Sequence, residues 1–89
     1  AVRLRAVDLG DGEALLAFGS TKFIHIHDLP DTYFLNLSDT GDLEEAASHL
    51  FSYLRKLDTC GAQTIAVMDI PNTGIGIAIN DRLKRAAQK

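Results

Sequence analysis

The sequence has no tryptophan, one cysteine, one methionine and two prolines, and it has no surplus of positive charge. The single cysteine, Cys60, excludes an internal disulfide, so a reducing cytoplasm is the expected setting. The net charge is −3, whereas direct binding of nucleic acid normally requires a basic excess. No apolar run approaches the roughly 20 residues that span a membrane. We therefore expect neither a nucleic-acid binder nor a membrane protein.

The 89 residues are enough for one small domain, covering positions 1–89. Hydrophobic residues make up 46% and charged residues 24%, which is the balance of an ordinary globular protein. The chain begins at Ala1 without a methionine and enters a strand-like segment at once. We interpret this start as the boundary of a domain within a longer protein.

Four segments have the apolar patterns of β-strands. Residues 2–7 alternate between apolar side chains and arginines, which predicts an edge strand with one wet face. Residues 14–18 and 64–70 are continuous apolar runs, a pattern typical of strands buried on both faces. Residues 33–37 are the fourth candidate, and 64–70 is the expected central strand.

Two segments have helical periodicity, residues 42–59 and about 75–87. In the first, Asp42 and Glu45 are placed to form a capping box, and Gly61 supplies the C-terminal stop. The apolar side chains of this segment recur at helical spacing and form one stripe, at Leu43, Ala46, Ala47, Leu50, Leu54 and Leu57. The alternation of strands and helices predicts a small layered α/β domain, with a mostly parallel sheet of about four strands and two main helices.

Arg82 does not fit the pattern of the second helix. It follows Ile75 by seven positions, which places it only about 20° away around the helix, within the expected buried stripe. A buried guanidinium requires a partner. We predict a structural ion pair between Asp58 and Arg82, with Asp69 as the second choice of partner. Two alternatives are that the Arg82 side chain extends past the stripe to water, and that it holds a phosphate or carboxylate.

Gly74 and Gly76 lie between an apolar strand and a helix, where phosphate-binding loops occur. The dinucleotide fingerprint is incomplete because its third glycine is replaced by Ile79, and no Walker lysine follows. Turn chemistry is the favoured interpretation, and phosphate binding by Gly74, Gly76 and Arg82 is the alternative.

Residues 19–32 are predicted to be a loop, with a short extended piece around 23–27. His25 and His27 could share one face of that piece, but no further ligand is spaced to complete a metal site. No nucleophile stands beside a base. We therefore predict no catalytic residue, no metal site and no cofactor in these 89 residues.

The second half of the chain resembles a known family. The runs GDLEEAA (41–47), LF (50–51) and LRKLD (54–58) resemble the opening helix of the C-terminal module of long-form threonylcarbamoyl-AMP synthases. The run GIGIAINDRLKRAA (74–87) is similar to the closing signature of that module, and GEALLAFG (12–19) resembles a shorter version of it.

The resemblance implies a Rossmann-like accessory domain that docks on, and gates, a catalytic YrdC-like domain of the same polypeptide. That catalytic domain, absent from this chain, would use ATP and Mg²⁺ to join threonine and bicarbonate into threonylcarbamoyl-AMP, for the threonylcarbamoyladenosine modification of tRNA. Other proteins of the tRNA pathway would be indirect partners, and this chain alone would not be an enzyme. The motif positions carry over without assigned roles: Arg55, Asp58, Gly74, Gly76, Asn80, Asp81 and Arg82. A small nucleotide- or phosphate-binding regulatory domain remains the alternative.

Overall fold

The structure is a computed structural model that describes residues 2–10, 12–21 and 29–88. Its four strands form one sheet in the order β1-β4-β2-β3, and each neighbouring pair is parallel. The predicted α/β domain with about four strands and two main helices is confirmed. The first strand lies at the edge of the sheet and the strand from Thr64 lies inside it, as predicted. The elements in chain order are β1 (Val2–Ala6), β2 (Glu13–Ala17), a 3-10 turn (Asp31–Tyr33), β3 (Phe34–Asn36), α1 (Leu43–Asp58), β4 (Thr64–Met68) and α2 (Ile75–Ala87).

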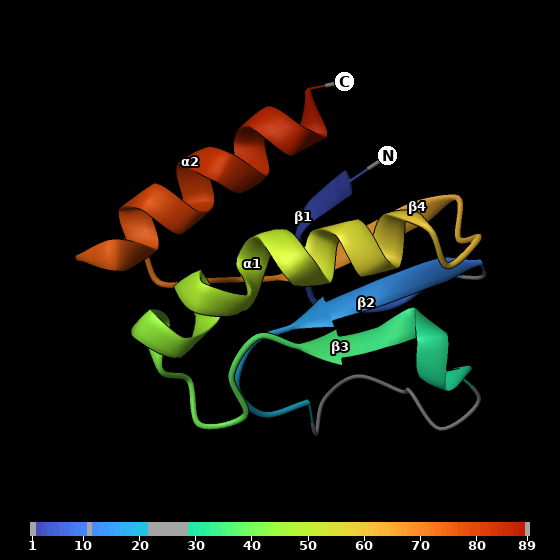
Figure 1. Cartoon of the computed structure of the whole chain (residues 1–89), viewed down its shortest axis with the longest axis horizontal. Helices are drawn as coiled ribbons and strands as arrows, with labels where there is room; N and C mark the ends of the chain where they lie inside the picture. The colour runs from blue at the N-terminus through green and yellow to red at the C-terminus, as the bar shows by residue number, and fades with distance from the viewer. Residues whose placement is uncertain (1, 11, 22–28, 89) are drawn as a thin grey trace.

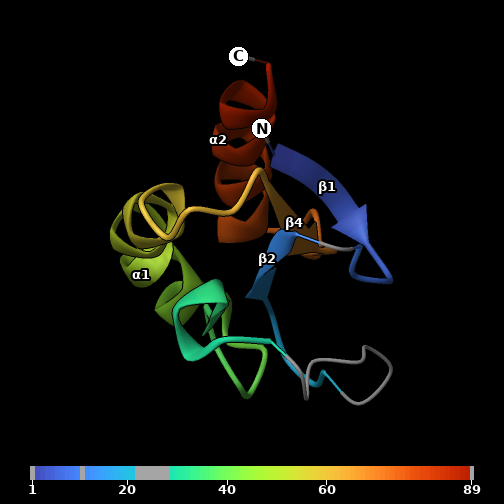
Figure 2. The same cartoon turned by 90° about the vertical axis from the view of Figure 1, so that its right-hand side faces the viewer.

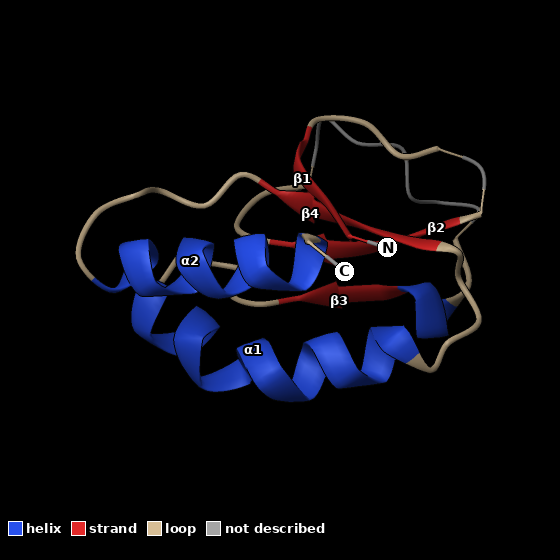
Figure 3. Cartoon of the chain, turned by 90° about the horizontal axis from the view of Figure 1, so that it is seen from above, coloured by secondary structure: helices blue, strands red, loops and turns tan. Residues whose placement is uncertain are grey.

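The two helices lie on the same face of the sheet (Figures 1 and 3). Figure 2, turned by 90°, shows the same two-layer arrangement. The opposite face carries a smaller buried cluster, against which Leu9, Leu29 and Phe34 pack. A parallel sheet is normally covered on both faces. Here helices cover one face, and side chains from β3 and the connecting segments cover part of the other.

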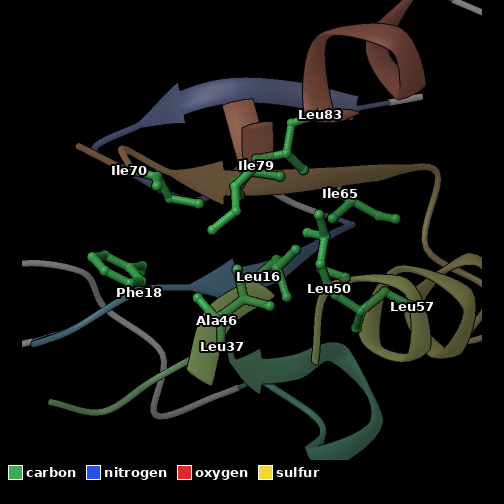
Figure 4. Packing of buried hydrophobic residues seen from close by; sticks show 12 residues of the cluster. Leu16, Phe18, Leu37, Ala46, Leu50, Leu57, Ile65, Ile70, Ile79 and Leu83 are labelled. Carbon is green, nitrogen blue, oxygen red and sulfur yellow. The ribbon is translucent and has the colours of Figure 1, made fainter. Parts of the chain in front are cut away.

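The main core lies between the sheet and the helices. Figure 4 shows Leu16 and Ile65 of the sheet together with Leu50 of α1 and with Ile79 and Leu83 of α2. Each of these side chains is almost fully buried. Burial of a leucine or isoleucine contributes about 1.5–3 kcal/mol. The helices are therefore held to the sheet mainly by their apolar stripes.

The third predicted strand is shorter than expected. β3 contains only Phe34–Asn36, because Tyr33 ends a 3-10 turn in which its N–H donates to the Pro30 carbonyl at 2.8 Å. Leu37 leaves the strand but stays buried. The extended piece predicted around 23–27, with His25 and His27, lies outside the described residues.

β1 contains a bulge at Arg5. Arg3 is paired with Ala66 and Ala6 with Met68, so β1 has one more residue than β4 between these points. Arg5 has a φ of 55°, in the left-handed region. As a result, Leu4 packs on the helix side, whereas Ala6 belongs to the cluster on the opposite face. The predicted simple alternation of residues 2–7 is therefore wrong, because the extra residue reverses the side on which Ala6 points.

The N-terminus of α1 is capped through a buried serine. The carboxylate of Asp42 accepts hydrogen bonds from the N–H groups of Glu44 and Glu45, as the predicted capping box requires. The return contact is different. The hydroxyl of Ser38 accepts from the Asp42 N–H at 2.9 Å and donates to the Glu45 carboxylate at 2.5 Å. Ser38, which is 2% exposed, thus completes the box in place of a direct contact.

Arg3 and Glu13 form a two-point ion pair that joins the start of β1 to the start of β2. The Arg3 guanidinium donates to both Glu13 carboxylate oxygens, at 2.9 and 2.7 Å. The Gly10 N–H donates to one of them at 2.6 Å. The hydrogen bonds from Arg3, with a smaller effect from Gly10, lower the pKa of the Glu13 carboxyl below its ordinary value of 4.5, and desolvation opposes them. Glu13 is therefore stabilised in its charged form.

We expect Glu13→Gln to lower the free energy of unfolding by about 1 kcal/mol at neutral pH. Because the folded-state pKa of Glu13 is lowered, its contribution is present above the ordinary pKa and is lost as the pH falls through the folded value. Urea unfolding of the unmodified chain and of Glu13→Gln, at pH 7 and near pH 3, measures this contribution. The difference in free energy of unfolding between the two proteins should shrink in acid, and a difference that stays constant would contradict the stabilising role of the ionised Glu13.

Candidate functional site

A groove lies at the carboxyl ends of β1 and β4, beside α2, with a volume of about 620 Å³. Figures 1 and 2 show α2 beside β1, the edge strand of the sheet. In open α/β sheets, ligands bind at the carboxyl ends of the strands. The lining residues are Leu4, Arg5, Val67, Met68, Asp69, Ile70, Pro71, Asn72, Ile77, Asn80, Asp81, Leu83 and Lys84.

The wall between β4 and α2 is held by Asn80. Its side-chain N–H₂ donates to the Ile70 carbonyl at 2.9 Å and to the side-chain oxygen of Asn72 at 3.3 Å. Ile70 is buried in the main core, which anchors the segment that follows β4. Asn80, a position of the family motif to which the sequence assigned no role, thus has a structural role on the groove wall.

The groove has two cations, Arg5 and Lys84, and two carboxylates, Asp69 and Asp81. Arg5 Nε lies 3.9 Å from the Asp69 carboxylate, and both side chains are largely exposed, so this pair is weak. Asp81 is paired with Arg85 at 3.1 Å. Lys84 has no ion-pair partner within the described part of the chain. With Arg85 beside Asp81, the charged groups at the groove are three cations and two carboxylates, which leaves one positive charge in excess.

The glycine turn before α2 serves backbone geometry. Gly74 is the N-cap residue and has a φ of 54°, which favours glycine. A Cβ on Gly76 would lie 1.9 Å from the Pro71 carbonyl oxygen, so only glycine fits there. The N–H groups of Gly76 and Ile77 already donate to the carbonyls of Thr73 and Gly74. Those two donors are not free for a phosphate, and this geometry favours the turn interpretation.

Arg82 is exposed, and its guanidinium carbon lies 4.0 Å from the ring centroid of Phe51 on α1. The expectation that it projects from the buried stripe is wrong. Ile75, used as the reference, is itself 42% exposed at the end of the helix. Measured from the buried residues instead, Arg82 lies about 60° from Ile79 and about 100° from Leu83. It is therefore on the flank that faces α1.

The predicted ion pair between Asp58 and Arg82 does not occur within residues 2–10, 12–21 and 29–88, and Asp58 is exposed. Asp69, the second choice, is near Arg5. Arg82 is stabilised by the Phe51 ring instead of by a carboxylate. It also lies about 10 Å along the helix from Ile75, and its guanidinium is on the Phe51 ring of α1 rather than at the Gly74–Gly76 turn.

Cys60 is half-buried as a free thiol. Among the residues that the structure describes, no group of three histidines, cysteines or carboxylates is arranged to hold a metal ion. Likewise, no described helix has both the length and the apolar character needed to cross a membrane. Sequence reasoning missed the groove, because its walls come from segments far apart in the chain.

Comparison with known protein families matches residues 4–88 to one family model, described as the C-terminal domain of threonylcarbamoyl-AMP synthase. No curated protein and no solved structure matches the chain. The matched segment runs from Leu4, the first residue of the groove, to beyond the end of α2.

Proposed function

Because the chain belongs to the family of threonylcarbamoyl-AMP synthase C-terminal domains, we propose that it acts as the accessory domain of such a synthase, docking on the catalytic domain and gating its active site. The match over residues 4–88 carries this proposal. In it, the catalytic domain holds ATP and Mg²⁺ and joins threonine and bicarbonate into threonylcarbamoyl-AMP for tRNA modification. The present chain supplies a binding surface.

The helix layer has a surface with the composition of a docking site. Phe51 on α1 is 56% exposed, and the Arg82 guanidinium stacks on it from α2. Ile75 lies on the same side of α2 as Arg82, about 20° away around the axis. We call these three residues the helix seam. Aromatic and arginine side chains carry much of the binding energy at protein interfaces, so the helix seam supports docking through the helical face.

Docking gives a simple physical route to gating. If the helix seam binds one conformation of the catalytic domain better than another, it shifts the balance between open and closed active sites by the difference in binding free energy. The accessory domain then changes activity without contributing a reacting group.

Mixing this chain with the isolated catalytic domain of a synthase of this family tests the proposal. We expect a saturable binding isotherm in calorimetry and a changed rate of threonylcarbamoyl-AMP formation. Phe51→Ser should weaken binding roughly tenfold or more, because it removes a central aromatic contact. The absence of both binding and a rate change for the unmodified chain would overturn the proposal.

Val7→Ala is the matched control. Val7 is also an exposed large apolar residue, but it lies in the connection between β1 and β2, whose Leu9 packs on the sheet face opposite the helices. Docking through the helix seam predicts unchanged binding for this variant. Circular dichroism of each variant verifies that the fold is retained.

A further inference from the structure

Arg5 has a strained backbone conformation, and nothing in the fold requires the residue at this position to be an arginine. Its φ of 55° is sterically unfavourable for a residue with a Cβ, and glycine would accept it more readily. Its side chain is 85% exposed, and among the described residues the one ion pair that it forms is with Asp69, at 3.9 Å. A pair of exposed charges at that distance adds little to stability. The strain is therefore better explained by what the side chain does at the surface.

The bulge determines where that side chain lies. In a regular strand Arg5 would share a face with Arg3, whose side chain is used in the ion pair with Glu13. The extra residue instead allows Leu4 and Arg5, neighbours in sequence, both to line the groove beside α2. β1 thus supplies an apolar contact and a cation to the same cavity.

The opposite wall supplies a second cation and a polar donor. Lys84 lines the groove from α2 without an ion-pair partner among the residues described, while Asp81 is paired with Arg85 at 3.1 Å. The side-chain oxygen of Asn72 accepts from Asn80, which leaves the Asn72 N–H₂ group as a donor with no hydrogen-bond partner in the described structure. These groups favour an anionic ligand.

The rest of the lining is apolar, and the groove is large. Leu4, Val67 and Leu83 contribute to it, and Ile77 is an exposed apolar residue at its margin. A volume of about 620 Å³ is far larger than a single phosphate needs and falls within the range of small-molecule sites. A ligand that fills it therefore has an apolar or aromatic body as well as a charged group.

We propose that this groove binds a small organic anion, whose phosphate or carboxylate is held by Arg5 and Lys84 and whose apolar or aromatic body packs on the groove floor. This site goes beyond the proposed docking function and is independent of it, because its residues are not those of the helix seam. It also differs from a phosphate site at Gly74, Gly76 and Arg82, since none of these three lines the groove.

Amide NMR titration of the 89-residue chain tests the proposal, with phenyl phosphate and AMP as probes and with inorganic phosphate and benzyl alcohol as their separate halves. We expect phenyl phosphate or AMP to shift the amides of Arg5, Asn72, Ile77 and Lys84, with affinity at least tenfold above that of either half. If neither probe produces these shifts at about 10 mM, where even a millimolar site is filled, the proposal is overturned. Equal binding of phosphate alone would overturn the apolar part.

Three variants locate the anion contact. Arg5→Gly should weaken binding by roughly fivefold or more, because a charge-assisted contact is lost, while its unfolding midpoint does not fall, because glycine accepts the positive φ. Arg55→Gln removes the same charge from an exposed position on α1 and should leave binding unchanged. If Arg82→Gln weakens binding and Arg5→Gly does not, the anion is bound elsewhere and the assignment is wrong.

Discussion

Gly76→Ala is expected to destabilise the chain by about 3 kcal/mol or more, although the same exchange inside most helices is stabilising. An alanine Cβ would lie 1.9 Å from the Pro71 carbonyl oxygen and 3.1 Å from its carbon. Both atoms belong to the backbone, so no side-chain rotation relieves the clash. To make room, α2 would have to move away from the segment that follows β4.

Urea unfolding followed by circular dichroism measures this effect. Ala78→Gly is the matched control, because Ala78 is exposed two residues along the same helix. This reverse exchange should cost only about 0.5–1 kcal/mol through helix propensity. A loss no larger for Gly76→Ala than for Ala78→Gly would mean that the close approach of α2 to Pro71 is not a constraint on stability.

Ser38→Ala should lower the free energy of unfolding by about 2 kcal/mol. The variant removes the hydroxyl that accepts from the Asp42 N–H and donates to the Glu45 carboxylate. Because Ser38 is buried, water does not readily replace those two hydrogen bonds. The loss should appear in chemical unfolding as a lower midpoint with an unchanged slope.

Ser48→Ala separates capping from a general effect of removing a hydroxyl. Ser48 is exposed on α1, where its hydroxyl donates to the Glu45 carbonyl of the same helix, so alanine should be neutral or slightly stabilising. Glu45→Gln combined with Ser38→Ala provides a second check. If the two side chains act as one cap, the double variant loses less stability than the sum of the single variants, whereas strict additivity speaks against the network.

The helices could be predicted well because their signals are local. Asp42 caps α1, with Gly61 shortly beyond its end, and the apolar periodicity defines the buried face. Periodicity does not place Arg82 correctly. The angle from Ile75 puts Arg82 in the buried stripe, but Ile75, although it matches the buried spacing, is half exposed because it is the first residue of α2. Periodicity gives an angle around a helix but does not show how far along it the core extends.

Features that depend on distant segments could not be predicted. Arg5 has no local signal for a bulge, since glycine is the residue that ordinarily marks a positive φ. Ser38 looks like an ordinary loop serine until the turn at Gly41 brings it against Asp42 and Glu45. The groove combines Arg5 with Asn72 and Lys84, and only the strand order reveals that these residues meet. The family resemblance identified the domain but not this cavity.

The strand order also constrains how the chain folds. β1 and β2 are both paired with β4 and not with each other, yet β4 begins only at Thr64. During synthesis, β1 and β2 are therefore made before the strand that pairs with both of them. Closing such long loops is slow relative to forming local contacts. β2, whose residues are mostly buried in the fold, therefore keeps one edge unpaired until β4 is made, and an exposed apolar strand is prone to aggregation during that interval.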